Sequence, residues 1–251
     1  MLKEAQEEDD KTGLSRCYNI MSQIYTIKRF DSMAFEWRLK EIELTEKYKI
    51  ENYNISQTYA QIANYYINQK KQKEALAAVE KAIATANSST QQISAKLEFV
   101  NYYSKFGDFQ AAEKLLKECQ AAFEQDKRLE SIKKRLYNIE CLYYQQTKQY
   151  PKALEAAKMQ EKEERRLSES ILSSIHYRTQ GEIYQKMGNM NLAVKYLQMY
   201  INTDDSLKIA NEQVSSSEFA TLLNVEKLNA EKKELMLQAQ EKELSLIHIS
   251  E

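Results

Sequence analysis

Residues 59–84 read YAQIANYYINQKKQKEALAAVEKAIA and hold the clearest copy of a pattern that recurs along the chain. In this copy Tyr59 and Tyr66 bracket small and apolar residues, and Ala75 comes nine residues after Tyr66. The alanines that close the five copies recur at intervals of 41, 37, 41 and 40 residues: Ala34, Ala75, Ala112, Ala153 and Ala193. A period of about 40 residues is typical of a stacked-repeat solenoid rather than of a compact enzyme.

The composition favours an all-α fold. The 251 residues include only 4 glycines and 1 proline, which nearly excludes a turn-rich β architecture. Lysine and arginine number 36 against 37 acidic residues, so the chain lacks the global basic footprint of a nucleic-acid-binding protein. The run Lys133-Lys134-Arg135 is expected to be a solvated helix face. No apolar stretch approaches the ~20 residues that span a bilayer.

The repeat predicts pairs of antiparallel helices. Tyr59, Ile62, Ala63 and Tyr66 fall on one helical stripe that would face the second helix of the pair, and the alanine there permits close approach. Gly107 and Gly188 suit the positive φ of a helix end, and Pro151 suits a helix start. The expected pairs are 12–28 with 31–48, 52–69 with 72–87, 91–105 with 109–124, 128–147 with 151–165, and 169–187 with 190–202.

Residues 15–202 resemble the tetratricopeptide repeat (TPR) family, whose pattern has aromatic, small and apolar residues at these spacings. The resemblance implies a right-handed α-solenoid of about five helix hairpins. Two positions depart from the pattern, Arg38 and Glu140, where the family has apolar residues. The core positions that the resemblance implies are Tyr25, Ala34, Tyr59, Tyr66, Ala75, Tyr103, Ala112, Tyr144, Ala153, Gly181, Tyr184 and Ala193.

The two ends read differently from the array at 11–203. Counting one period back from Ala34 makes residues 1–10 the remnant of a preceding repeat helix. The sequence of residues 204–243 predicts a long charged connecting helix. Its heptad pattern is interrupted, so the sequence leaves open whether this helix pairs in a homodimer. Residues 244–251 read LSLIHISE, which resembles a translated sequencing adapter, so this tail is interpreted as non-native and His248 carries no functional weight.

The residues of the array indicate no catalytic chemistry. With His248 set aside, His176 is the remaining histidine, and it is expected to lie on a helix surface or in packing. Cys17, Cys119 and Cys141 lack metal-ligand spacing and are expected to be packing thiols. We therefore expect no catalytic residue, no metal and no cofactor in this segment. An enzyme domain, such as a kinase, downstream of residue 243 stays open.

A binding surface is the better prediction, because repeat solenoids expose the outward face of their first helices in a groove. The resemblance places the following residues there: Arg16, Asn19, Gln23, Gln57, Asn64, Asn101, Arg135, Asn138, Gln145 and Arg178. Further positions on the same face are Ala60, Ser94, Leu97, Leu142, Glu182 and Gln185. Side-chain amides suit the N–H and C=O groups of an extended peptide. The alternative is that these amides occupy polar helix faces simply because such faces are hydrated.

Aromatic residues offer further candidate contacts. Tyr65, Tyr102 and Tyr143 each precede a core tyrosine and could lie nearer the surface. Trp37 is either an anchor for a partner or, by the more favoured interpretation, part of the packing between repeats.

The leading functional hypothesis is a protein- or peptide-binding sensory or scaffold segment. The array followed by a charged helix resembles the TPR sensor region of bacterial membrane-bound histidine kinases or LuxR-type regulators. That resemblance implies a membrane segment after residue 243 and a location on the periplasmic face of the inner membrane. The alternative is a freestanding cytosolic adaptor or peptide-responsive regulator, and the sequence leaves the compartment open.

Overall fold

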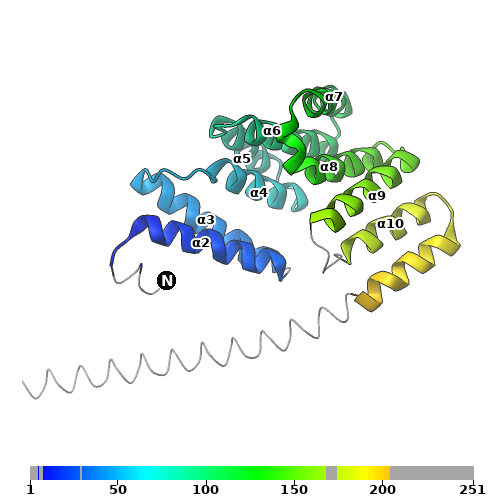
Figure 1. The fold of residues 1–251 in the computed structure, drawn as a ribbon, viewed down its shortest axis with the longest axis horizontal. Helices are drawn as coiled ribbons and strands as arrows, with labels where there is room; N and C mark the ends of the chain where they lie inside the picture. Colours follow the sequence, from blue (N-terminus) through cyan, green and yellow to red (C-terminus); the bar gives the residue numbers. More distant parts are fainter. Residues whose placement is uncertain (1–4, 6–7, 29, 168–173, 204–251) are drawn as a thin grey trace, which may run out of the picture. The chain divides into compact units, whose positions relative to one another are not determined.

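The protein is described by a computed structural model that places residues 5, 8–28, 30–167 and 174–203 (Figure 1). Contacts divide the chain into two compact units, 1–200 and 201–251, and the helical array belongs to the first. Most of the expected repeat remnant at 1–10, the connecting helix at 204–243 and the tail at 244–251 lie outside the described residues.

The described residues are helical, which confirms the all-α prediction. The helices are α2 (Lys11–Ile27), α3 (Asp31–Tyr48), α4 (Ile55–Asn68), α5 (Gln72–Ala84), α6 (Ser89–Phe106), α7 (Phe109–Gln125), α8 (Lys133–Gln146), α9 (Tyr150–Leu167) and α10 (Ile175–Lys186), followed by a helix over 190–203. A 3₁₀ helix, η1 (Lys127–Ile132), precedes α8.

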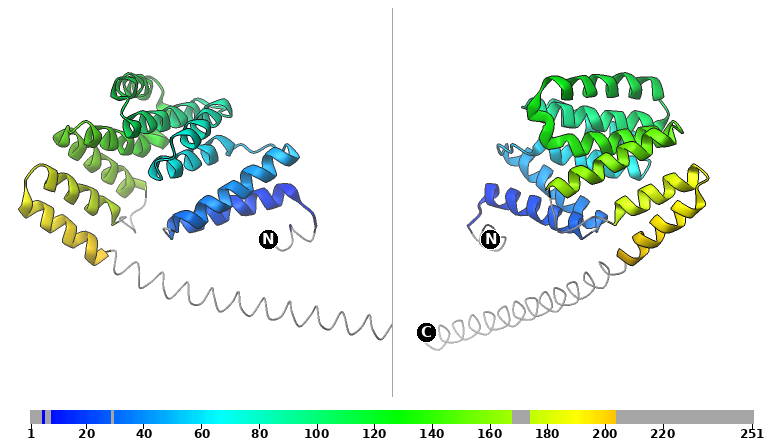
Figure 2. Two further views of the ribbon diagram at one scale, coloured as in Figure 1. Left: turned by 180° about the vertical axis from the view of Figure 1, so that it is seen from behind. Right: turned by 45° about the vertical axis from the view of Figure 1, so that its right-hand side comes forward.

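Successive helices pack as hairpins, α2 with α3, α4 with α5, α6 with α7 and α8 with α9. The first helices of neighbouring hairpins also pack side by side, α4 against α6 and α6 against α8 (Figures 1 and 2). Because each hairpin contacts its neighbours in sequence, the core is distributed along the array rather than gathered at one centre.

The hydrogen bonds of the hairpin turns explain the nine-residue spacing between tyrosine and alanine. In the second hairpin the Tyr66 carbonyl accepts the Lys71 N–H at 2.9 Å, and the Lys71 carbonyl accepts the Ala75 N–H at 2.9 Å. The first bond spans five residues and closes a Schellman turn, and the second is the first helical bond of α5. The same two bonds recur with Phe30, Asp108, Gln149 and Asn189 as the middle residue.

In the turns before Ala75, Ala112, Ala153 and Ala193, the residue five positions before the alanine is left-handed, as a Schellman turn requires. Gly107 and Gly188 take this conformation with φ of 92° and 78°. Lys70 and Lys148 hold the same place with φ of 58° and 60°. The turn is therefore imposed by the hairpin even where the residue has a Cβ.

The five alanines are buried, with Ala34, Ala75, Ala112 and Ala153 at 0% exposure and Ala193 at 2%. They belong to, or neighbour, clusters that join successive hairpins, such as the cluster in which Ala112 and Leu116 of α7 meet Val100 of α6 and Ile139 of α8. Cys119 lies in this cluster and Cys141 in the next. Burial raises the pKa of the Cys119 thiol to about 12 and that of Cys141 to about 11.

The structure corrects several local expectations. Tyr102 and Tyr143 are buried, at 6% and 5% exposure, rather than near the surface. Leu97, expected on the groove face, lies in the core, whereas Ala60 is buried but lines a cavity beside Gln57. One-residue shifts of this kind arise because neighbouring positions on a helix differ by about 100°, so a stripe read from sequence can be displaced by one position.

Two further differences concern helix ends and polar core positions. Residues 127–132 form η1 rather than the start of an α-helix, because the Asp126 carboxylate accepts the Arg128 N–H at 3.0 Å and caps a tighter turn.

Arg38 is buried at a position where the family has an apolar residue, and it donates to Gln61 Oε1 at 2.7 Å and Thr26 Oγ1 at 2.5 Å. Its hydrogen bonds offset the cost of burying a polar group there.

Candidate functional site

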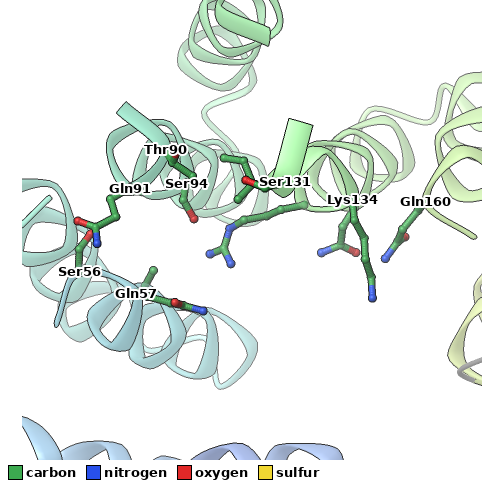
Figure 3. A pocket seen from close by; sticks show the side chains of 13 residues that line it. Ser56, Gln57, Thr90, Gln91, Ser94, Ser131, Lys134 and Gln160 are labelled. Atoms are coloured by element: carbon green, nitrogen blue, oxygen red, sulfur yellow. The ribbon is translucent and has the colours of Figure 1, made fainter. Parts of the chain in front are cut away.

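Three neighbouring cavities, of about 390, 260 and 210 Å³, lie around α4. Residues of α4, α6 and α8 line the first and the third, and residues of α2, α3 and α4 together with Arg135 of α8 line the second. They are neighbours, since Arg135 lines the first and second, Asn64 and Asn68 the second and third, and Asn138 the first and third. We call the surface formed by all the residues that line these three cavities the polar groove. Figure 3 shows its first cavity, where side chains including Gln57, Ser94 and Lys134 converge from different helices.

Amide side chains line the polar groove along its length. They are Gln57, Gln61, Asn64, Asn68, Gln69, Gln91, Asn101, Asn138, Gln146 and Gln160. Each amide offers two donors and an acceptor. Asn68 Nδ2 donates to Asn64 Oδ1 at 2.9 Å, which orients the Asn64 amide from one helical turn away. The surface thus presents both hydrogen-bond donors and acceptors.

The charged residues that line the polar groove are mostly cationic, with Lys105, Lys134, Arg135 and Arg38 set against Asp31. The run 133–135 is not a uniformly solvated face as expected, because the Arg135 side chain is 26% exposed and lines two cavities.

Arg135 is held in place by a buried carboxylate. Its Nη2 lies 2.6 Å from Oε1 of Glu98, which is 1% exposed on α6. Asn101 Nδ2 donates to the other Glu98 oxygen at 3.4 Å. Arg135 Nε is buried and has no hydrogen-bond partner within the described part of the chain. Such a charge-assisted bond fixes the guanidinium before any ligand arrives.

Lys134 is positioned by a second carboxylate. Its Nζ lies 2.8 Å from Glu164 Oε2, and His176 Nε2 lies 2.6 Å from the same oxygen. Burial alone would raise the pKa of Glu164, but the hydrogen bonds from Lys134 and His176 outweigh it and lower that pKa. His176 is buried at 3% exposure, so it serves packing and this contact.

Half of the sequence-predicted groove residues share the polar groove, and half lie elsewhere. Gln57, Asn64, Asn101, Arg135 and Asn138 line it. Arg16 and Asn19 line a separate cavity on α2 and α3, and Gln23 donates to Asn19 Oδ1 at 2.6 Å. Gln145 donates to Cys141 Sγ at 3.3 Å, and Arg178 lies 3.4 Å from Glu182 on α10. The role of all ten residues in binding stays a prediction.

The sequence did not predict several residues that line the polar groove. It also left two interpretations of Trp37, an anchor for a partner or part of the packing between repeats. Gln61 and Asn68 lie one turn from the chosen positions, and Ser56 and Thr90 come from helix starts that the family pattern does not mark. Trp37 packs its ring 5.4 Å from that of Tyr18, with Lys40 Nζ 4.3 Å above it.

Two other kinds of site, a metal centre and a membrane span, are absent from the described residues. No group of three or more histidine, cysteine, aspartate or glutamate side chains is arranged to hold a metal ion there. No helix within the same residues is long and apolar enough to cross a membrane. The expectation that this segment lacks catalysis stays a prediction.

No family model and no curated protein matches the chain. Among solved structures, BtubC (BKLC) from P. vanneervenii is 14% identical with a TM-score of 0.50, covering 82% of this chain and 88% of that one. PilW, a widely conserved type IV pilus biogenesis factor, is 18% identical at a TM-score of 0.48, with 80% and 82% covered. MamA is 17% identical at 0.40, with 76% and 92% covered. The chain has a TPR-like fold of helical hairpins.

Proposed function

We propose that the protein is a scaffold whose polar groove binds an extended peptide segment of a partner protein, with an acidic side chain or carboxylate placed at Arg135. The observation that carries the proposal is the set of three neighbouring cavities around α4, which are lined by amides and share residues that include Arg135, held by Glu98.

The amides supply the sequence-independent part of such binding. An extended peptide presents an N–H and a C=O at each residue, and amides satisfy both without a charge. Asn64, Asn101 and Asn138 come from three successive first helices, so a peptide that crosses the helices would meet one after another. These three are our preferred main-chain contacts.

Arg135 makes the proposed peptide binding selective for a carboxylate. Because Glu98 holds Nη2, little side-chain entropy remains to be lost when a ligand carboxylate reaches the exposed part of the guanidinium. The neighbouring Lys134 and the scarcity of acidic lining residues strengthen the preference for an anion. A neutral peptide would keep the contacts with the amides but would lose the electrostatic attraction to Arg135 and Lys134.

A selection from a random dodecapeptide library tests the proposal. We expect enriched peptides to carry Asp or Glu, and their Asn or Gln counterparts to bind at least tenfold more weakly. The Asn64→Ala plus Asn101→Ala variant should weaken every selected peptide, and Arg135→Gln should weaken only the acidic ones. Gln110→Ala and Arg165→Gln, at exposed positions outside the groove, are the controls. Unchanged affinity in the groove variants would refute the proposal.

The signalling role expected from the sequence rests on residues 204–243 and on the reading frame beyond them. We propose it as the biological setting of the scaffold, with the freestanding adaptor as the alternative. The genomic reading frame past codon 243 tests it, since an apolar span of about 20 residues supports a membrane-linked regulator and a stop codon supports the adaptor.

A further inference from the structure

A second cavity of about 390 Å³ lies apart from the polar groove, between α2, α3 and the segment 50–54. The Glu41 carboxylate on α3 forms part of its lining and is 1% exposed. The other lining residues include Arg16, Asn19, Asn52 and Tyr53.

Neutral donors surround the Glu41 carboxylate. Asn19 Nδ2 lies 3.2 Å from Oε1 and 3.1 Å from Oε2, so one amide is shared between both oxygens. Asn52 Nδ2 donates to Oε1 at 2.8 Å, and Thr58 Oγ1 donates to Oε2 at 3.3 Å. These bonds satisfy the oxygens but do not neutralise the charge.

Two other partly or fully buried carboxylates of the array have a cation instead. Glu98 is bonded to Arg135 at 2.6 Å and Glu164 to Lys134 at 2.8 Å. No lysine or arginine in the described ranges forms an ion pair with Glu41. Arg38, one turn away on α3, is bonded to Gln61 and Thr26, and its positive charge acts on Glu41 without forming an ion pair with it. An ionised carboxylate in this setting costs free energy that an opposite charge would offset.

The edge of the cavity suits a small cation. Glu51 adds a second carboxylate, and Tyr53, which is 65% exposed, offers an aromatic face that can contact an ammonium group. Arg16 is the opposing charge on the lining. The long bonds of the Asn19 amide, both above 3.0 Å, make it the contact that a stronger donor would displace.

We propose that this cavity, which we call the Glu41 pocket, binds a primary ammonium group of a partner protein, from a lysine side chain or a peptide amino terminus. The ammonium donates to Glu41 in place of Asn19 and rests against Tyr53. This site is separate from the polar groove and does not depend on the peptide binding proposed there.

The test is a titration of the full chain with n-butylammonium chloride, followed by the NMR signals of the Asn19 and Asn52 side-chain amides. We expect saturable shifts that n-butanol and potassium chloride at equal concentration do not produce. Glu41→Gln should weaken the binding at least tenfold, whereas Glu43→Gln, at an exposed position of α3 outside the pocket, should change it by less than about threefold. Equal shifts with n-butanol, or unchanged affinity in Glu41→Gln, would overturn the proposal.

A measurement on the unmodified protein covers the case in which Glu41→Gln does not fold. The carboxyl carbon of Glu41 should titrate at a lower pH when n-butylammonium is present, because the ammonium stabilises the ionised form. An unmoved midpoint counts against the site. Tripeptides with a free amino terminus, with one lysine and a blocked terminus, or with neither, identify the source of the ammonium. Equal binding of the fully blocked neutral peptide contradicts the proposal.

Arg135→Gln separates this inference from the proposed function. Butylammonium binding should be unchanged in that variant, while the affinity for acidic peptides falls. Loss of both activities together would mean that one surface accounts for both, and the Glu41 pocket would not stand as a separate site.

Discussion

Arg135 Nη2 and Glu98 Oε1 lie 2.6 Å apart and tie α8 to α6 across two neighbouring hairpins. The carboxylate is almost fully buried, whereas the guanidinium reaches the polar groove. This one pair therefore contributes both to the packing between hairpins and to the charge of the candidate binding surface.

Breaking the pair from one side should destabilise the array. We expect Glu98→Gln to lower the free energy of unfolding by about 3 kcal/mol, because it leaves a partly buried cation without its partner. Urea denaturation measures this. The double variant Glu98→Gln plus Arg135→Gln should lose less than the sum of the single variants. As a control, Glu113→Gln in the solvent-exposed pair with Lys117 should leave the free energy of unfolding almost unchanged. Additive effects would show that the two side chains do not interact.

The hairpin turns predict a stabilising substitution. Lys148 holds φ of 60° in a Schellman turn where glycine is the usual residue. Lys148→Gly should raise the free energy of unfolding by about 0.5 to 1 kcal/mol, since it removes left-handed strain at the cost of some chain entropy. Gly107→Ala is the reverse test, because its added Cβ meets no atom within 4 Å and the cost is conformational alone. A loss of stability in Lys148→Gly would contradict this explanation of the turn.

The last described hairpin depends on a close approach at Gly181. A Cβ built there would lie 2.8 Å from Leu197 Cγ and 3.2 Å from its backbone nitrogen. Gly181→Ala should therefore lower the melting temperature, with an overpacking cost of about 1 to 3 kcal/mol. In a Leu197→Ala background the same substitution should cost less, because only the backbone contact remains. Equal costs in both backgrounds would place the strain elsewhere.

The burial of the Glu41 carboxyl group predicts how the stability of the protein depends on pH. Burial is the largest influence and raises its pKa above the usual 4.5, against the lowering effect of hydrogen bonds from Asn52, Asn19 and Thr58. The folded protein thus holds this proton more tightly than the unfolded chain. The stabilisation that results from this tighter binding of the Glu41 proton is fully present below pH 4.5 and is lost as pH rises through the folded-state pKa of Glu41.

Urea denaturation between pH 4.5 and 7 tests this sign. Stability of the wild type relative to Glu41→Gln should fall as pH rises above 4.5 and should level off once pH exceeds the folded-state pKa of Glu41. Asp126 provides a contrast, because its bonds to Arg128 lower its pKa to about 2. Its contribution is present above pH 3.8 and is lost as pH falls towards 2. Parallel curves for wild type and Glu41→Gln would show that the Glu41 proton is not linked to folding.

How much of this could be predicted from the sequence depended on how local the cause was. The interval from Tyr66 to Ala75 follows from a bond of five residues and a bond of four, so it recurs wherever the turn recurs. The positions of Tyr102 and Leu97 depended on which side of a helix meets its neighbours, and a shift of one residue reversed the expectation for both. Arg135 belonged to a basic run, and nothing local marked Glu98 as its partner.

The amino-acid sequence by itself determined that the chain forms helical hairpins about 40 residues apart, because backbone hydrogen bonding and apolar spacing act over a few residues. Only the tertiary structure decided which polar side chains share a surface. Glu98 meets Arg135, and Glu41 meets Asn19, through contacts between separate helices, and Asn52 reaches Glu41 from the segment between α3 and α4. Such contacts depend on how the hairpins pack, and the charge of a buried group is set by neighbours that the local sequence does not name.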